Sequence, residues 1–301
     1  MRIEKVGPGY AICADSAQPG LRSTVRQLTG EVPLIIADPP YGNILDIKWD
    51  KDYGTDEKKF AAWMIGWTRV WSTLLLPDAA FYIWGGIGTP GFHPFFRYLA
   101  DIEHEQDIGL KIANLITWSK KRAYGVKHNY LFTREELVYL FKGNDIKKPR
   151  CFHVPLLEET RCYKGFNPKY PAKSDRYRRT NVWTDVTEIM RGKVHDAQKH
   201  QRVIEIPIEV HTEPGEWVID PFAGSGTTAF AAWKLGRRFV VIEKDEQIFE
   251  EMLARLRVNE QSVEVRSTGA PATAERERAG NDALRGMENE TDGRGSGEGQ
   301  A

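Results

Sequence analysis

The stretch Trp217-Val-Ile-Asp-Pro-Phe-Ala-Gly-Ser-Gly-Thr-Thr228 carries the strongest structural signal in this sequence. Its apolar start predicts a strand over residues 216–220, and the small residues that follow predict a loop leading into a helix over residues 227–235. Glycines in such a loop let a ligand approach the backbone, and the helix N-terminus offers free N–H groups to a polar or anionic part of that ligand. A second strand, residues 238–243, ends in Glu243, and an acid about 20 residues after such a loop suits a ribose diol.

The usual phosphate-binding loops fit this stretch poorly. No Gly-Lys-Ser/Thr follows the loop, which disfavours a P-loop. The third glycine of the dinucleotide fingerprint is also missing, since Ala229 and Phe230 occupy that part of the chain. The loop therefore predicts a nucleoside-like cofactor without a pyrophosphate, and the alternative is an ordinary tight turn between a strand and a helix.

A second motif, Asp38-Pro39-Pro40-Tyr41, follows the wholly apolar run of residues 34–37. That run predicts a buried parallel strand, and ligands of open α/β sheets bind at the carboxyl ends of such strands. A carboxylate and a proline-fixed carbonyl are two acceptors in a rigid turn, and they can hold the two hydrogens of an amino group. The Tyr41 ring offers a stacking surface for a base turned out of its helix. The alternative is a strand-ending turn capped by Asp38, which we would favour if the glycine-rich loop were absent.

Strand and helix patterns alternate along the rest of the chain. Apolar runs predict strands over residues 10–14, 79–84, 111–118 and 137–141, whereas spacings of three and four predict helices over 56–76, 93–102, 201–211 and 245–258. Pro77 is expected to close the first of these helices, whose Trp63, Trp67 and Trp71 we interpret as a core stripe. The pattern predicts an α/β fold with a doubly wound, mostly parallel sheet covered by helices on both faces.

Charge is unevenly distributed in this 301-residue chain, of which 41% is hydrophobic. The 42 basic and 42 acidic residues cancel overall, yet residues 120–179 hold 16 basic and 6 acidic side chains. Within that part, residues 144–180 show no clear period and predict a basic irregular insertion, a candidate for contacting a nucleic acid or else a solvated loop. Residues 267–301 have almost nothing apolar to bury and predict a disordered tail.

Cysteine and histidine usage bounds the remaining function classes. Cys13, Cys151 and Cys162 lack paired spacing and the histidines lack metal-ligand spacing, so we expect no disulfide framework and no metal. No apolar run approaches the ~20 residues that span a bilayer, and no signal peptide is apparent. We therefore expect a cytoplasmic protein without a membrane partner.

The two motifs together resemble those of the DNA amino-methyltransferases. The target-amine motif at Asp38 precedes the cofactor motif at Asp220, with a basic segment between them, and this order resembles the circularly permuted β class of that family. The resemblance covers roughly residues 1–258. Five further stretches contribute to it: Ala14-Asp15-Ser16, residues 114–120, residues 134–143, residues 181–183 and residues 195–199.

The resemblance implies a role for each candidate residue and S-adenosyl-L-methionine as the cofactor. Asp38, Pro39, Pro40 and Tyr41 would bind and orient the target base. Glu243 would accept the ribose hydroxyls and Asp15 the adenine amine. Lys199 would also belong to the cofactor site, although His200 stands where the family commonly has proline, and a solvated charge at a helix start is an equal alternative. The methionine moiety would lie against the loop residues Asp220, Pro221, Phe222, Gly224, Ser225, Gly226 and Thr227.

The resemblance also implies how the chain is divided. Residues 1–143 would form the catalytic half, 144–180 the target-recognition region and 181–266 the S-adenosylmethionine-binding half of one domain, with 267–301 as the tail. A homodimer is plausible on the same ground.

The expected reaction is direct in-line methyl transfer to the exocyclic amine of a flipped base in double-stranded DNA. The aspartate that opens the target-amine motif favours adenine N6, while cytosine N4 and an RNA substrate stay open as alternatives. A catalytically silent nucleic-acid-binding protein is the alternative of another class, and the two intact motifs argue against it. Methylation of cytosine C5 needs a nucleophilic cysteine, typically after proline, whereas Cys151 and Cys162 each follow arginine.

Overall fold

The computed structural model describes residues 1–41, 56–86, 93–124, 127–128, 130–160, 176–187 and 199–268. The chain divides into two compact units, Met1–Leu256 and Arg257–Ala301. The second unit is described only as far as Thr268, where a helix ends. Within the described parts of the chain, no helix has both the length and the apolar character that crossing a membrane requires.

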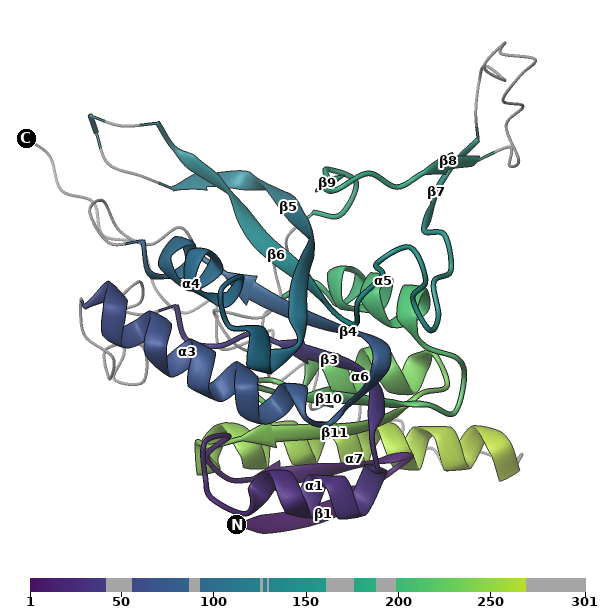
Figure 1. Ribbon diagram of the computed structural model, residues 1–301. Helices are drawn as coiled ribbons and strands as arrows, with labels where there is room; N and C mark the ends of the chain where they lie inside the picture. The colour runs from purple at the N-terminus through teal and green to yellow at the C-terminus, as the bar shows by residue number, and fades with distance from the viewer. Residues whose placement is uncertain are drawn as a thin grey trace, which may run out of the picture. The chain divides into compact units, whose positions relative to one another are not determined.

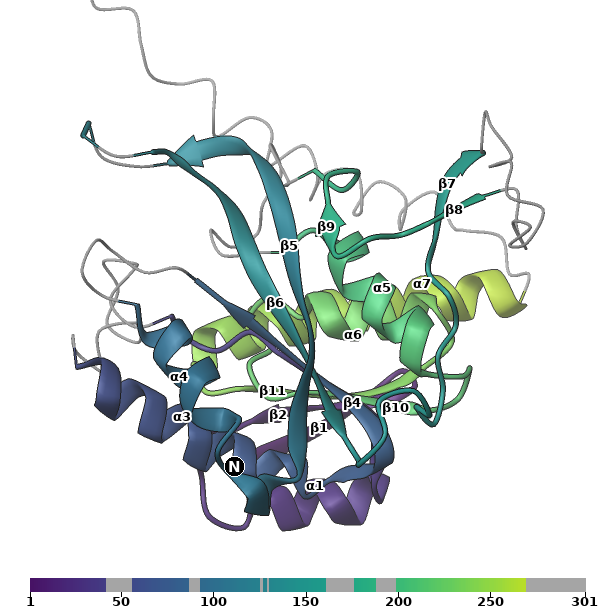
Figure 2. The same ribbon diagram turned by 45° about the horizontal axis from the view of Figure 1, so that its top comes forward.

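Among the described residues, a nine-stranded sheet runs through the first unit in the order β1-β2-β11-β10-β3-β4-β6-β5-β9 (Figures 1 and 2). The five strands from β2 to β4 in this order are parallel, while β1 and β6 each run antiparallel to their neighbours. The fold is therefore α/β with a mostly parallel sheet, as the sequence predicts. The strands are β1 Arg2–Val6, β2 Gly9–Cys13, β3 Val32–Ala37, β4 Leu75–Gly85, β5 Leu110–Tyr124, β6 Phe132–Lys142, β9 Val182–Trp183, β10 Trp217–Asp220 and β11 Arg238–Glu243.

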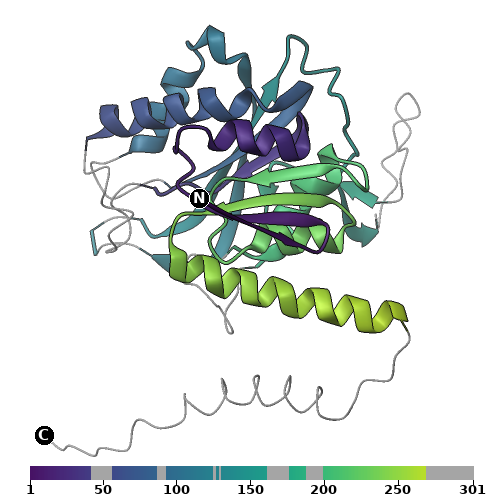
Figure 3. The ribbon, with the colours of Figure 1, turned by 90° about the horizontal axis from the view of Figure 1, so that it is seen from below.

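Helices cover both faces of this sheet (Figure 3). Buried side chains of α1, α3 and α4 pack on one face, and those of α5, α6 and the first turns of α7 pack on the other. The sheet is thus doubly wound, which confirms the predicted architecture. The helices are α1 Leu21–Thr29, α3 Glu57–Ser72, α4 Pro94–Ile102, α5 Gln201–His211, α6 Thr227–Lys234 and α7 Glu246–Thr268.

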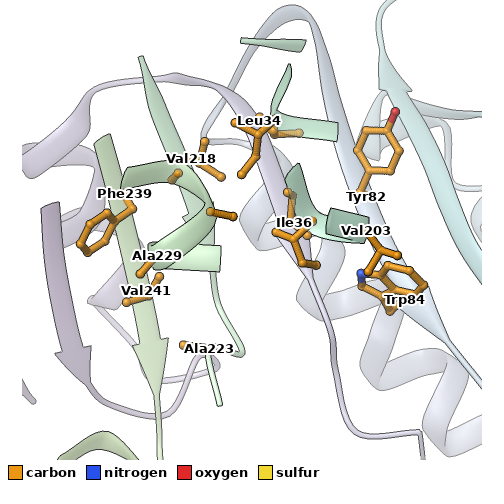
Figure 4. Close-up of a cluster of buried hydrophobic side chains, with 14 of the residues drawn as sticks. Leu34, Ile36, Tyr82, Trp84, Val203, Val218, Ala223, Ala229, Phe239 and Val241 are labelled. Atoms are coloured by element: carbon orange, nitrogen blue, oxygen red, sulfur yellow. The ribbon is translucent and has the colours of Figure 1, made fainter. Parts of the chain in front are cut away.

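Strand β3 illustrates how the sequence builds both cores. All six of its residues are buried, which is typical of a parallel strand covered on both faces. Because successive side chains point to opposite faces, Leu34 and Ile36 enter one core and Ile35 and Ala37 the other. Figure 4 shows the first core, where Leu34 and Ile36 lie near Val203 of α5 and Val218 of β10.

The helix predicted over residues 56–76 is shorter than expected. Asp56 caps it by accepting the N–H groups of Lys58 and Lys59 at 3.0 and 3.1 Å, and α3 ends at Ser72. The chain joins the sheet at once, since the Leu74 carbonyl accepts the N–H of Val32 in β3. Pro77 therefore lies in β4, where the β3–β4 register shifts and no ladder hydrogen bond from its nitrogen is needed.

Other expectations need similar corrections. Strands β5 and β6 are longer than the predicted 111–118 and 137–141, because their polar halves carry no apolar signal and extend beyond β4 (Figure 2). Helix α1 and strand β1 were not predicted, and α7 extends ten residues past the predicted end at Val258.

The basic insertion is not wholly irregular. Strands β7 Leu156–Thr160 and β8 Arg176–Arg178 pair antiparallel as a separate two-stranded sheet. Residues 161–175 between them lie outside the described residues, as do 188–198 and the predicted tail from 269 onward.

Candidate active site

Four candidate carboxylates come to one edge of the sheet. Asp15 follows β2, Glu243 ends β11, Asp220 ends β10 and Asp38 follows β3, and these strands are neighbours and parallel. The chain steps in opposite directions on the two sides of the β10–β3 pair, from β10 to β11 and from β3 to β4. Such a switch point, at the carboxyl ends of the strands, is where open α/β sheets bind ligands.

The target-amine motif forms a closed hydrogen-bonded turn. The Tyr41 hydroxyl donates to Asp38 Oδ1 at 2.8 Å, and the Lys199 ammonium donates to Asp38 Oδ2 at 2.7 Å and to the Tyr41 oxygen at 3.0 Å. Pro39 is buried, while the Asp38 side chain is 25% exposed. Each carboxylate oxygen thus has one donor, and a second lone pair on each stays available in principle to an amino group.

The structure decides against one of the two places that the sequence offers for Lys199, and its role at the cofactor stays a prediction. Its side chain is 9% exposed, so the solvated-charge alternative is wrong, and its ammonium lies on the target-amine motif rather than on the cofactor loop. A second carboxylate, that of Glu135 in β6, lies 3.2 Å from the same ammonium. Residues 188–198, which precede Lys199, are outside the described residues.

Glu135 is a residue that sequence reasoning missed. Because β6 runs antiparallel to β4, the start of β6 lies at the same edge as the end of β4. Glu135 also pairs with Lys120 of β5. Burial alone would raise the pKa of Glu135, but Lys199 and Lys120 outweigh it and lower that pKa. The available signal is a run of three charged residues, 134–136, directly before the apolar half of β6.

The Asp220 carboxyl group of the cofactor motif accepts hydrogen bonds from neutral donors. Asp220 is 4% exposed and accepts the Phe222 N–H at 2.9 Å and the Thr228 hydroxyl at 2.5 Å. Burial raises the pKa of Asp220 to about 7. The Asp220 carboxyl group therefore fixes the loop conformation through hydrogen bonds to residues of the loop and of the helix that follows it.

Glu243 and the two glycines fix the rest of this loop. The Glu243 carboxylate accepts the N–H groups of Gly224 and Asp245, each at 2.9 Å, and burial raises its pKa. Both Gly224 and Gly226 have positive φ, of 50° and 83°. A Cβ at Gly226 would lie 2.7 Å from Met252 Cγ, whereas a Cβ at Gly224 would meet nothing within 4 Å. The loop thus packs tightly at Gly226 and opens at Gly224.

Asp15 and the tryptophan stripe border the same loop. Asp15 is exposed and accepts the Ala17 N–H at 2.8 Å, which makes it the turn residue at the end of β2. The next residue, Ser16, receives the indole N–H of Trp67 at 3.2 Å. The centroid of the Trp67 ring also lies 4.8 Å from the centroid of the Phe222 ring in the cofactor loop. Trp67 and Trp71 are buried and Trp63 is half-buried against the same core, so the predicted core stripe is confirmed for its last two members.

The remaining loop residues surround these groups. Pro221 and Ser225 are buried, the Ser225 and Thr227 hydroxyls lie 3.4 Å apart, and Arg255 donates to the Ser225 carbonyl at 2.8 Å. The structure therefore brings Asp38, Tyr41 and Lys199 into one cluster and the residues of the glycine-rich loop, with Glu243, into another.

The expectation of no metal stays a prediction. Among the described residues, Cys151, His153 and Glu213 place possible ligand atoms within 4.8 Å of one another. Two of these side chains already contact each other, since His153 Nε2 lies 2.8 Å from the carboxylate oxygen Oε1 of Glu213. Both of these side chains are more than half exposed, so the group forms a polar surface cluster.

The chain is similar to several named DNA methyltransferases. It is 28% identical to the type II methyltransferase M2.DpnII of Streptococcus pneumoniae over 244 residues, or 75% of this chain and 81% of that protein. It is 27% identical to the type II methyltransferase M.HpaI of Haemophilus parainfluenzae over 75% of this chain and 68% of that protein.

Solved structures of two such enzymes share the fold. The M1.HpyAVI–SAM complex matches with a TM-score of 0.56 and 22% identity over 82% of this chain and 98% of that chain. The PvuII DNA methyltransferase, named as cytosine-N4-specific, matches with a TM-score of 0.60 and 17% identity over 83% of this chain and 87% of that chain. The family model described as DNA methylase matches residues 32–254, which include both clusters. The chain therefore belongs to the N6-adenine and N4-cytosine family of DNA amino-methyltransferases.

Proposed function

We propose that this protein transfers a methyl group from S-adenosyl-L-methionine to the exocyclic amine of a flipped base in double-stranded DNA, with adenine N6 as the acceptor. The observation that carries the proposal is the position of the Asp38 carboxylate at the switch point, one strand away from the glycine-rich loop. Membership of the DNA methylase family supports the reaction class, and the aspartate that opens the motif supports adenine.

The loop after β10 has the properties that a nucleoside-like cofactor needs. Gly224 leaves open space where a side chain would project, and the carboxylates of Glu243 and Asp15 stand at the ends of the next two strands. We assign Phe222, Gly224 and Thr227 to the methionine end of the cofactor, Glu243 to its ribose and Asp15 to its adenine. When bound, S-adenosylmethionine supplies an electrophilic methyl group on a sulfonium centre.

Asp38 orients the attacking amine in this proposal. Its carboxylate and the Pro39 carbonyl accept the amine hydrogens, which aims the nitrogen lone pair toward the cofactor side of the sheet edge. As the nitrogen gains positive charge during transfer, the fixed negative charge of Asp38 stabilises it. The N–C bond forms as the S–C bond breaks, the amine displaces the thioether of the used cofactor, and the methylated amine then releases one proton to solvent. No covalent enzyme intermediate is needed, and holding amine and electrophile in line contributes to the rate enhancement.

Residues 144–180 are the proposed DNA-recognition region. Arg176 and Arg178 of β8 are exposed, and Arg178 lies over the Phe152 ring at 5.8 Å. Arginines in this setting can contact phosphates or guanine edges. We keep the homodimer as a proposal of the same standing, to be checked by the mass of the protein in solution.

The deciding experiment follows methyl transfer from labelled S-adenosylmethionine to unmethylated DNA, with mass spectrometry of the digested nucleosides. We expect N6-methyladenine from the wild type and none from Asp38→Ala. The matched control is Asp101→Ala, which removes an aspartate paired with Arg97 on the surface of α4 and should keep activity.

Each other product has a defined meaning. N4-methylcytosine would retain the mechanism and overturn the choice of base. Cofactor binding without any DNA methylation would overturn the DNA substrate.

A further inference from the structure

Three elements far apart in the sequence place charged side chains against one another at the target-amine motif. Asp38 follows β3, Glu135 begins the polar end of β6, and Lys199 precedes α5. The Lys199 ammonium lies between the two carboxylates, 2.7 Å from Asp38 Oδ2 and 3.2 Å from Glu135 Oε2. The methyl-transfer proposal uses Asp38 alone and leaves the other two without a role.

The surroundings of the ammonium are those of a fixed, dehydrated cation. An ammonium has three hydrogens to donate, and Lys199 has three oxygen neighbours in Asp38, Glu135 and the Tyr41 hydroxyl. Its nitrogen also lies 5.3 Å from the ring centroid of Trp84, which is fully buried. Burial opposes the charge on Lys199, but Asp38 and Glu135 outweigh it and raise its pKa.

The charges of this cluster constrain what each member can do. Without the ammonium, the Asp38 and Glu135 carboxylates would lose the cation that lies between them, and a like charge nearby disfavours the ionised form of a carboxylate. Without the Glu135 carboxylate, the ammonium would neutralise Asp38 alone. With all three present, Asp38, Glu135 and Lys199 sum to one negative charge, which Lys120 balances from its place on Glu135, so that Asp38 keeps its negative charge beside the place where the amine becomes positive. Lys120, on the other side of Glu135, is nearer to solvent, with 21% of its side chain exposed.

We propose that Lys199 and Glu135 are positioning residues for Asp38. Lys199 fixes Asp38 Oδ2 while the Tyr41 hydroxyl fixes Oδ1, so that the carboxylate is held in one orientation toward the amine, and Glu135 shares the ammonium charge so that Asp38 keeps its own. The inference rests on the proposed function, because it assigns these residues to the amine that Asp38 is proposed to hold. It moves Lys199 from the cofactor to the target base and adds Glu135 to the site.

The test compares Lys199→Met, Glu135→Gln and the double variant with the wild type. For Lys199→Met we expect a loss in kcat of about 100-fold, as for a small misplacement of a reacting group. Its affinity for S-adenosylmethionine, measured by calorimetry, should be unchanged. The acid limb of its kcat profile should move to higher pH, because the carboxylate pair then lacks the cation that favours its ionised form. The double variant removes that pair and should return the limb toward its original position and recover part of kcat.

Two further measurements separate positioning from mere loss of structure. Lys234→Met is the matched control, since Lys234 also pairs with a buried glutamate at 2.7 Å, in Glu205 of α5, and it should behave as wild type. The charge state of Glu135 can be followed without turnover by NMR of carboxyl-labelled glutamate, with Glu135→Gln as the assignment. Its titration should move to higher pH in Lys199→Met. The other titratable groups around the pair are Tyr41, Lys120 and Asp220, which none of these variants changes.

The outcomes are distinguishable. An unchanged Glu135 titration in Lys199→Met overturns the inference, and so does an acid limb that stays in place or a double variant no better than Lys199→Met. A wild type that binds the cofactor but methylates no DNA overturns the proposed function instead, and the NMR titration then decides the charge arrangement independently.

Discussion

The two clusters at the edge of the sheet hold their carboxylates in opposite ways. Asp38 and Glu135 both pair with Lys199, which lies between them, and Glu135 also pairs with Lys120. Asp220 and Glu243, only one and two strands away from Asp38, are held in the contacts described here by backbone N–H groups and one hydroxyl. As a result the pKa of Glu135 is lowered, whereas burial raises the pKa values of both Asp220 and Glu243.

This difference separates two tasks of one site. In the proposed reaction, the fixed ionic charge of the target side acts on an amine whose charge changes. The cofactor side uses buried carboxyl groups as hydrogen-bond acceptors that give the loop its shape. We therefore expect substitutions on the cofactor side to act through stability and loop geometry, and those on the target side to act through catalysis.

The largest effect on stability should come from Gly226→Ala. Alanine at a φ of 83° is strained, and its Cβ would overlap Met252, so we expect a loss of roughly 2–4 kcal/mol in the free energy of unfolding. Chemical denaturation measures it. Gly20→Ala is the control, because Gly20 has a similar φ of 85° but open space around it, and should lose only about 1–2 kcal/mol. Equal losses in the two variants would show that the loop is not closely packed at Gly226.

Asp220→Asn and Glu135→Gln should change stability with opposite dependence on pH. The folded state keeps the Asp220 proton up to about pH 7, whereas an unfolded aspartate releases it near 3.9. Raising the pH through this window therefore removes stability from the wild type, by at most about 1.4 kcal/mol per pH unit, and Asp220→Asn escapes that loss. The stability of Asp220→Asn relative to wild type should rise from about pH 4 to about pH 7.

The contribution of Glu135 to stability depends on pH with the opposite sign. Its lowered pKa contributes stability above the unfolded value of about 4.3, and that contribution is lost as the pH falls through the folded value. The deficit of Glu135→Gln should therefore be full near neutral pH and shrink below about pH 4.3. Thermal unfolding of both variants across pH measures the two trends, and trends of the same sign would remove the distinction between the clusters.

The sequence predicts the cofactor cluster better than the target cluster, for a physical reason. The loop after β10 is held mainly by contacts within residues 220–228 and by the end of the next strand, so a short stretch of sequence contains most of its determinants. The target cluster joins residues 38, 135 and 199, whose meeting depends on the order and direction of strands. Spacing along the chain carries no signal for such a contact, and so the sequence indicates neither Glu135 nor the contact between Lys199 and Asp38.

The elements that the sequence missed follow the same logic. Helix α1 buries only Leu21 and Val25, too few apolar residues to show a period. The start of β6 is polar and partly exposed, so its alternation is lost. By contrast β3, β10 and β11 are apolar nearly throughout, and their limits were predicted to within two residues.

The smallest effect that we predict is a change in DNA affinity that leaves cofactor affinity unaltered. Arg178→Ala removes one exposed cation of β8 from the proposed recognition region. If this arginine contacts a phosphate, DNA affinity should fall modestly and uniformly across sequences, and the slope of log Kd against log salt concentration should lessen by about 1. The affinity for S-adenosylmethionine should not change, since the cofactor loop lies at the ends of β10 and β11.

Fluorescence anisotropy at several salt concentrations measures the slope. Arg22→Ala serves as a control of equal charge, since Arg22 lies on α1, which covers the sheet face away from α5. An unchanged slope for Arg178→Ala would remove β8 from the DNA-binding surface and leave recognition to another part of the basic segment.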